Sequence, residues 1–203
     1  MSRIIVDAVR NSSASSDGIT LASDGSVTIP GNATCSGTAT GFGGGKLLQV
    51  VQTAKTDHYS VTNTTGTDIT GMDVTITPAS SNSKVLILVE LAVGDQGNGY
   101  SGFKLIRGST TIGQSTALDS ANVSNTQDTA FGFGSESSQA TYKLNNTSFN
   151  FLDTPSTTSA TTYKVQIVTW TSTTFHLNRP NSVGNARYTM SGTSTITALE
   201  IGA

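Results

Sequence analysis

Short stretches in which apolar and polar residues alternate recur along most of this 203-residue chain, and turn-forming residues separate them. Met72, Val74 and Ile76 form one such series, and the stretch from Thr162 to Thr171 contains another. A period of two places every second side chain on one face of a β-strand, and many short strands at this spacing indicate a sandwich or a barrel. We therefore predict an all-β, antiparallel fold.

The polar composition supports the same fold class. The chain contains 27 serines and 34 threonines against 11 basic and 13 acidic residues. This charged fraction is about half that of an average globular domain. Threonine is β-branched and suits the pleated, half-buried surface of a strand, whereas runs of Ala, Glu, Lys and Leu that would favour helices do not occur.

Charge and hydropathy argue against several classes of protein. The net charge is −2 and the basic residues are scattered, so the sequence lacks the basic patch of a nucleic-acid-binding protein. It also lacks the 18 or so consecutive apolar residues of a membrane span. Met1–Asp7 is not followed by the apolar stretch of a secretory signal, so we expect synthesis in a cytoplasm. Cys35 is the only cysteine, which excludes an intrachain disulfide.

A glycine-rich segment, Gly41–Gly45, divides the sequence into two parts. We predict an N-terminal attachment and stalk segment over residues 1–45 and a β-sandwich head over residues 46–203. Glycine lacks a Cβ atom and permits the flexible or unusual backbone expected at such a boundary.

The N-terminal part contains two Asp-Gly turn signals, each followed by a short alternating stretch with Ile19 and Leu21, or Val27 and Ile29, on one face. Two such units cannot enclose a core by themselves. Two interpretations remain open, namely a disordered tail and a stalk in which the strands of three chains intertwine around a shared axis. We favour the stalk, because the apolar residues alternate rather than scatter.

The strongest apolar run of the second part is Lys84–Val93, for which we predict a central strand buried on both faces. Phe103–Ile112 is typical of a hairpin with its turn near Gly108. The interval from Gly113 to Asn146 indicates strands only at 130–133 and 141–144. Further strands are expected at 47–53, 57–61, 68–77, 148–152, 162–171, 175–178 and 194–201.

Several segments of the chain resemble a domain of tail fibres and other virion appendages of marine tailed bacteriophages. The resemblance is carried by Leu47–Val51, Val74–Leu86, Leu105–Ile112, Phe151–Lys164 and Ser194–Ile201. The opening stretch Ile5–Leu21 is similar to the leader with which such fibres begin. None of these motifs is catalytic. The long shaft of many such fibres has no counterpart in this chain, which leaves room for a short tail appendage or a capsid-surface fibre.

The resemblance implies a homotrimer with a jelly-roll head, broadly similar to the C1q/TNF type, located in the virion and acting in attachment. It also implies that the N-terminal segment binds other virion proteins, for which Ile4, Val6 and Val9 are the candidate residues.

The residues that could carry chemistry do not form a recognisable site. His58 and His176 stand in different predicted strands without ligands at metal-binding spacing, so we predict no metal and no cofactor. Gly41–Lys46 fails as a phosphate-binding loop because Leu47 follows the lysine. The acids Asp119, Asp128, Glu136 and Asp153 fall in or near loops, which leaves a carbohydrate-cleaving enzyme as a minor alternative.

Binding is the more plausible activity. The loops 94–102 and 119–139 combine Gly, Asn, Asp and Gln with aromatic residues, a mixture that suits a host-surface glycan or protein. Tyr100, Phe131 and Phe133 are the candidate receptor-binding residues, although ordinary turns and core aromatics are the simpler interpretation. Trp170 is more typical of a core or a trimer interface.

We therefore expect a non-enzymatic phage virion protein, a trimeric short tail fibre or appendage. The alternatives are a capsid decoration or head fibre protein and, less favoured, a carbohydrate-active enzyme or lectin-like module.

Overall fold

The computed structural model of the chain describes residues 7–9, 12–13, 15, 19–29, 46–62, 66–94, 99–114, 131–135, 142–169, 174–184 and 189–202, and of residues 99–101 and 131–135 the backbone alone. The chain forms two compact units, Met1–Phe42 and Gly43–Ala203.

Three short strands form an antiparallel sheet in the N-terminal unit. In sheet order they are β1 (Ala8–Val9), β2 (Ile19–Leu21) and β3 (Val27–Thr28). The predicted turn at Asp24-Gly25 is confirmed, with the Ser26 amide donating to Asp24 Oδ1 at 2.8 Å and a φ of +85° at Gly25. Leu21 and Val27 are 40% and 56% exposed. Leu21 and Val27 are therefore largely uncovered, and the predicted intertwining of three chains remains a prediction.

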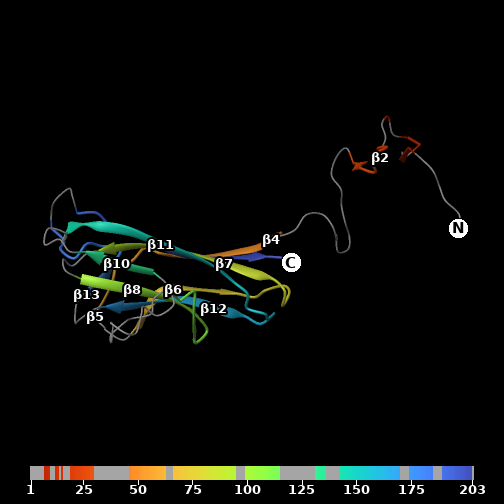
Figure 1. Ribbon diagram of the computed structural model, residues 1–203. Helices are drawn as coiled ribbons and strands as arrows, with labels where there is room; N and C mark the ends of the chain where they lie inside the picture. The colour runs from red at the N-terminus through yellow and green to blue at the C-terminus, as the bar shows by residue number, and fades with distance from the viewer. Residues whose placement is uncertain are drawn as a thin grey trace. The chain divides into compact units, whose positions relative to one another are not determined.

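The C-terminal unit is a sandwich of two antiparallel sheets (Figure 1). Its strands are β4 (Leu47–Lys55), β5 (Tyr59–Thr62), β6 (Thr67–Ile76), β7 (Lys84–Gly94), β8 (Gly99–Arg107), β9 (Thr110–Ile112), β10 (Phe131–Ser135), β11 (Leu144–Asp153), β12 (Thr161–Thr169), β13 (Thr174–Leu177) and β14 (Ser194–Ile201). None of the described residues is in an α-helix. Accordingly, the described part of the chain includes no helix long and apolar enough to cross a membrane.

The strand order is that of a jelly roll. In the larger sheet, β4 pairs with β14, β14 with β7, and β7 with β11, while β13 and β5 extend this sheet at one end. In the smaller sheet the order is β10-β8-β12-β6, with β9 also paired to β8. The first and last strands are thus neighbours, and the chain repeatedly crosses from one sheet to the other, as in a double Greek key. The predicted all-β antiparallel sandwich is confirmed.

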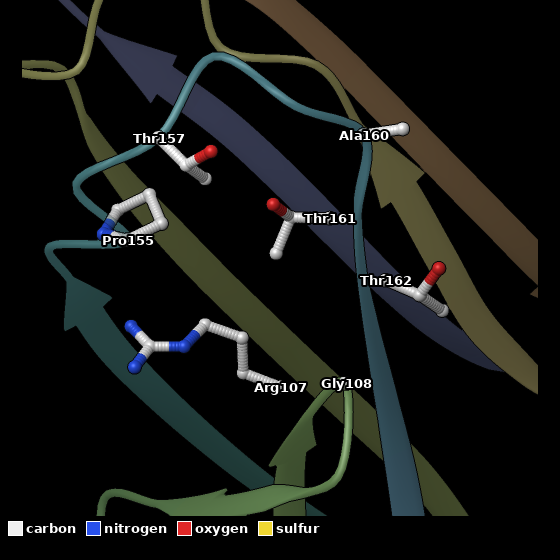
Figure 2. A pocket seen from close by; sticks show the side chains of 7 residues that line it. All are labelled: Arg107, Gly108, Pro155, Thr157, Ala160, Thr161 and Thr162. Atoms are coloured by element: carbon white, nitrogen blue, oxygen red, sulfur yellow. The ribbon is translucent and has the colours of Figure 1, made fainter.

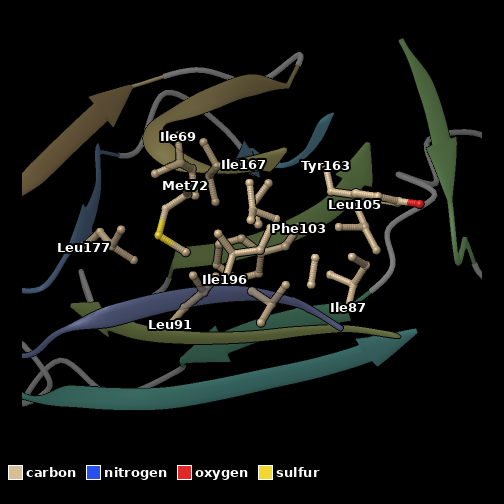
Figure 3. Packing of buried hydrophobic residues seen from close by; sticks show 14 of the residues in the cluster. Ile69, Met72, Ile87, Leu91, Phe103, Leu105, Tyr163, Ile167, Leu177 and Ile196 are labelled. Atoms are coloured by element: carbon tan, nitrogen blue, oxygen red, sulfur yellow. The ribbon is translucent and has the colours of Figure 1, made fainter. Parts of the chain in front are cut away.

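The core lies between the two sheets, where alternate residues of the facing strands meet (Figure 3). The alternating series predicted to share a face do so: Met72, Val74 and Ile76 of β6 are all at most 2% exposed. The rings of Phe103 and Phe175 pack edge to face with centroids 5.6 Å apart. Core side chains of this kind contribute roughly 1.5–3 kcal/mol each through burial.

The prediction that Lys84–Val93 is buried on both faces is wrong for part of the outward face of β7, where Lys84, Leu88 and Glu90 are exposed. Val85, Ile87 and Val89 point inward and are at most 2% exposed, whereas Leu88 on the other face is 40% exposed. The inward half of this apolar run is covered by the smaller sheet, and nothing described within the C-terminal unit covers Leu88.

Candidate functional site

One row of apolar side chains crosses four strands on the outward face of the larger sheet. Leu199 of β14 lies opposite Val50 of β4 on one side and opposite Leu86 of β7 on the other, and Leu86 lies opposite Leu152 of β11. Val50 is 54% exposed and Leu152 is 47% exposed. Because a single residue shift would turn these side chains to the other face, the pairing register is what aligns them.

Further apolar residues border this row on the same face. We call the whole set the outer patch, and it consists of Leu47, Leu48, Val50, Leu86, Leu88, Leu152, Leu199 and Ile201. Leu47 and Leu48 stand at the register shift between β4 and β14 and are 56% and 46% exposed. A contiguous apolar surface on a soluble domain marks an interaction site more often than chance exposure of single residues does.

The outward face of the smaller sheet has the opposite character. Asp68 accepts a hydrogen bond from Lys164 Nζ at 2.6 Å and another from Gln166 Nε2 at 2.7 Å. Partial burial raises the pKa of the Asp68 carboxyl, but these two donors outweigh it and the net pKa is lowered. The hydroxyls of Thr75 and Thr162 bond each other at 2.8 Å. The polar face is suited to water, whereas the outer patch is not.

Two buried carboxylates stand in the neighbouring row, which faces inward. Gln49, Glu200, Val85 and Asp153 follow one another across the same four strands. Glu200 is fully buried, accepts from Gln49 Nε2 at 2.6 Å and receives the Ala79 amide at 2.7 Å. Burial raises the pKa of the Glu200 carboxyl, but the hydrogen bonds prevail and lower it. Glu200 thereby ties the β6–β7 loop to the last strand.

The second carboxylate, Asp153, forms an ion pair with Arg107 at the end of β8. Arg107 Nη1 lies 2.9 Å from both oxygens of Asp153, and the Tyr163 hydroxyl donates to Asp153 Oδ2 at 2.7 Å. Burial, together with this bond to a carboxylate, raises the pKa of Tyr163 far above its ordinary range. The cluster joins β8, β11 and β12. It was not predicted, because only the sheet pairing brings the ends of these strands together.

A shallow hollow of about 360 Å³ lies beside this ion pair. Figure 2 shows the Arg107 side chain extending beneath the loop that carries Pro155 and Thr157. The hydroxyl of Thr157 accepts the Ser159 amide at 3.0 Å, and that of Thr161 donates to the Ser159 carbonyl at 3.0 Å. The Arg107 charge is balanced by Asp153, and these hydroxyls hold the loop, so the geometry is that of a structural turn.

The predicted receptor-binding residues stand on two paired strands. Tyr100 is in β8, and Phe131 and Phe133 are in β10, with Phe131 opposite Phe103 and Tyr100 opposite Gly134 in the backbone register. Their side chains lie outside the described residues, so their role remains a prediction. Of the predicted attachment residues, Val9 is in β1 and 52% exposed, while Ile4 and Val6 lie outside the described residues.

Each histidine bonds a serine hydroxyl, and only the His176 bond joins two strands, β13 and β5. His176 Nδ1 bonds Ser60 Oγ at 2.7 Å, and His58 Nε2 bonds Ser191 Oγ at 3.2 Å. Burial and the nearby Arg179 charge lower the pKa of His176. Among the residues that the structure describes, no three His, Cys, Asp or Glu side chains cluster as metal ligands. Cys35, Asp119, Asp128, Glu136 and Trp170 lie outside the described residues.

Comparisons with known proteins add little to this picture. No family model matches the sequence, and neither does any curated protein. Among solved structures, the chain is similar to the structure of infectious bursal disease virus Gt strain, with 15% identity and a TM-score of 0.39 over 91% of this chain and 48% of that chain. It is also similar to the Gx strain structure, with 15% identity and a TM-score of 0.36 over 85% of this chain and 42% of that one. The chain thus spans less than half the length of either viral chain, and a likeness this distant carries no functional conclusion.

Proposed function

We propose that this chain is a non-enzymatic virion structural protein of a tailed bacteriophage, a homotrimeric short tail fibre or appendage that contributes to host attachment. The observation that carries the proposal is the place of the segments that resemble phage appendages. Five of these segments lie at one end of the sandwich: the start of β4, the β6–β7 loop, the β8–β9 turn, the β11–β12 loop and the end of β14.

The links between these segments are structural. Gln49 of β4 and Ala79 of the β6–β7 loop both bind Glu200 of β14. Arg107 at the end of β8 binds Asp153 at the end of β11. The resemblance therefore coincides with residues that close the sandwich, which favours a shared architecture and a mechanical role over shared chemistry.

The proposed mechanism is multivalent binding. Three copies of a rigid head present three equivalent weak sites, and their avidity exceeds the affinity of each one by orders of magnitude. The N-terminal unit would attach the trimer to the particle through Val9 and its neighbours Ile4 and Val6. The strands β8 and β10, which carry Tyr100, Phe131 and Phe133, would contribute to the receptor surface.

Two measurements test the proposal. Gold-labelled antibodies against this chain should decorate the tail of intact virions in electron micrographs. Label on the capsid would instead support a decoration or head fibre protein, and unlabelled virions would refute a virion role. Release of reducing sugar from host polysaccharide by the purified chain would contradict a non-enzymatic function.

A further inference from the structure

We infer that the outer patch is the surface on which copies of this chain meet, with Lys84 of one copy facing Glu90 of its neighbour. The inference rests on the homotrimer of the proposed function and adds to it the face and the contacts. The occupant is a second copy of this chain.

The burial of β7 supports this contact surface. A near-continuous apolar run such as Val85–Val93 is typical of strands that are covered on both faces. The smaller sheet covers the inward residues, whereas Leu86 is half-buried and Leu88 is 40% exposed. An additional protein layer on the outward face would complete the burial that this sequence pattern indicates.

A further uncovered apolar surface supports the same occupant. In the N-terminal unit, Val9, Leu21, Val27 and Ile29 are between 40% and 56% exposed. Copies arranged about one axis could cover both surfaces at once, whereas an unrelated partner bound to the sandwich would cover one. The chain enters the sandwich at Lys46, whose carbonyl accepts the Gly202 amide at 2.8 Å, beside the outer patch. In copies that meet on the patch, the points at which the chains enter their sandwiches would therefore lie close to one another.

Charge complementarity also supports contact between copies. Lys84 and Glu90 both lie on the outward face of β7, at opposite borders of the patch, and both are exposed. Six residues of strand separate them, a distance of about 20 Å, so they cannot pair within one chain. Opposite charges at two borders of one patch can pair between copies, which fixes the register of the contact.

The decisive experiment uses the full chain and compares Val50→Asp with Val183→Asp by sedimentation equilibrium. The two valines are similarly exposed, at 54% and 59%, and only Val50 is in the patch. The wild type and Val183→Asp should sediment at three times the 20.9 kDa chain mass. Val50→Asp should raise the dissociation constant at least about 100-fold, which corresponds to about 2.7 kcal/mol. Far-UV circular dichroism should stay unchanged, because Val50 contributes little to the core.

The outcomes separate this inference from the proposed function. A trimeric Val50→Asp would overturn the inference and leave the homotrimer standing, and equal dissociation of both variants would also overturn it. A wild type that is monomeric at all concentrations would contradict the homotrimer itself. That result would overturn the inference as well, because copies that never associate cannot meet on the patch.

A charge exchange tests the predicted contact. Lys84→Glu should weaken the trimer about tenfold, and adding Glu90→Lys to the same chain should restore the dissociation constant to within about threefold. Because the two positions are too distant to interact in one chain, such a rescue must occur between copies. A double variant weaker than Lys84→Glu alone would overturn the pairing.

Discussion

Glu200 and Asp153 lie on either side of Val85 in one inward-facing row of the larger sheet. Each carboxylate is buried: Glu200 accepts the Ala79 amide of the β6–β7 loop, and Asp153 accepts from Arg107 at the end of β8, at the same end of the sandwich. Burying a charge is costly unless it is paired or well hydrogen-bonded. Asp153 is paired with Arg107, and Glu200 accepts hydrogen bonds from the Gln49 side chain and the Ala79 amide. They close an end of the sandwich where the apolar core stops.

Replacement of Glu200 by glutamine should destabilise the protein. The amide group would place a second donor against the Gln49 side chain or the Ala79 amide and leave one of them without an acceptor. We expect a loss of about 2–3 kcal/mol in the free energy of unfolding, measured by urea denaturation. Asp73→Asn, at an exposed position of β6, is the control and should change the free energy by less than about 0.5 kcal/mol. Equal stability of the two variants would contradict the role of Glu200.

Stability should fall on acidification in two pH windows. The pKa of His176 is lowered from 6.5 and that of Glu200 from 4.5 in the folded state, so the unfolded chain binds more protons in both cases. The stability from His176 is therefore lost as the pH falls below about 6.5, and that from Glu200 as it falls below about 4.5. Urea midpoints measured from pH 8 to pH 3 should show both losses. The Glu200→Gln variant should show a smaller lower loss, because Asp68 also has a lowered pKa, and it should keep the upper one.

Local alternation allowed much of the fold to be predicted from the sequence. The last strand, Ser194–Ile201, has the predicted bounds, and β7 begins at Lys84 as expected. The strand expected at 141–144 is wrong, since Tyr142 and Lys143 precede β11. β11 is longer than the predicted 148–152 and runs from Leu144 to Asp153. Its first half contains asparagines, which disfavour strands, and it is extended because ten residues pair with β7.

The candidate site was less predictable, because it depends on register. The sequence identifies Leu86 and Leu88 as apolar, but only the pairing of β4, β14, β7 and β11 aligns them with Val50, Leu152 and Leu199. Likewise, Arg107 and Asp153 are 46 residues apart, and no local pattern indicates that they form an ion pair. Contacts between residues on different strands can be predicted only when the pairing of those strands is known.

The ion pair at the end of β8 should show strong coupling in a double-mutant cycle. Arg107→Ala leaves a buried carboxylate facing the Tyr163 hydroxyl alone, and we expect a loss of about 2–3 kcal/mol. Asp153→Asn should cost a similar amount. The double variant should cost less than the sum by at least about 1 kcal/mol, because each single change already breaks the pair. Additive losses in urea denaturation would show that the contact contributes nothing.

Gly94 should tolerate no side chain. At the end of β7, a Cβ atom on this residue would overlap the carbonyl oxygen of Arg179 in the loop that follows β13. Gly94→Ala must therefore displace backbone, and we expect a loss of about 3 kcal/mol or more in thermal or urea unfolding. Gly184→Ala is the matched control, since an added Cβ there would meet no atom within 4 Å. It should be neutral to within about 0.5 kcal/mol, and an equally harmful effect would discredit the steric explanation.

Asn178 joins the loop after β13 to three strands. Its backbone φ is +63°, and its Nδ2 donates to the carbonyls of Lys55 at 2.8 Å and Asp57 at 2.9 Å. Its Oδ1 accepts the Ser194 hydroxyl at 2.7 Å, and that hydroxyl accepts the Ala92 amide. A left-handed backbone suits asparagine and glycine, and the side chain is fully buried, so backbone and side-chain contributions can be separated.

Two substitutions at this position should therefore differ in a defined order. Asn178→Gly keeps the left-handed backbone but leaves the bonded groups unpaired, which should cost about 2–3 kcal/mol in urea denaturation. Asn178→Ala should cost about 1 kcal/mol more, because alanine resists a positive φ. Asn82→Ala, in an exposed loop, controls for loss of an asparagine and should be neutral. If Asn178→Gly were as stable as the wild type, the buried hydrogen bonds would not be what holds this loop. If Asn178→Gly were less stable than Asn178→Ala, the positive φ would not explain the choice of residue.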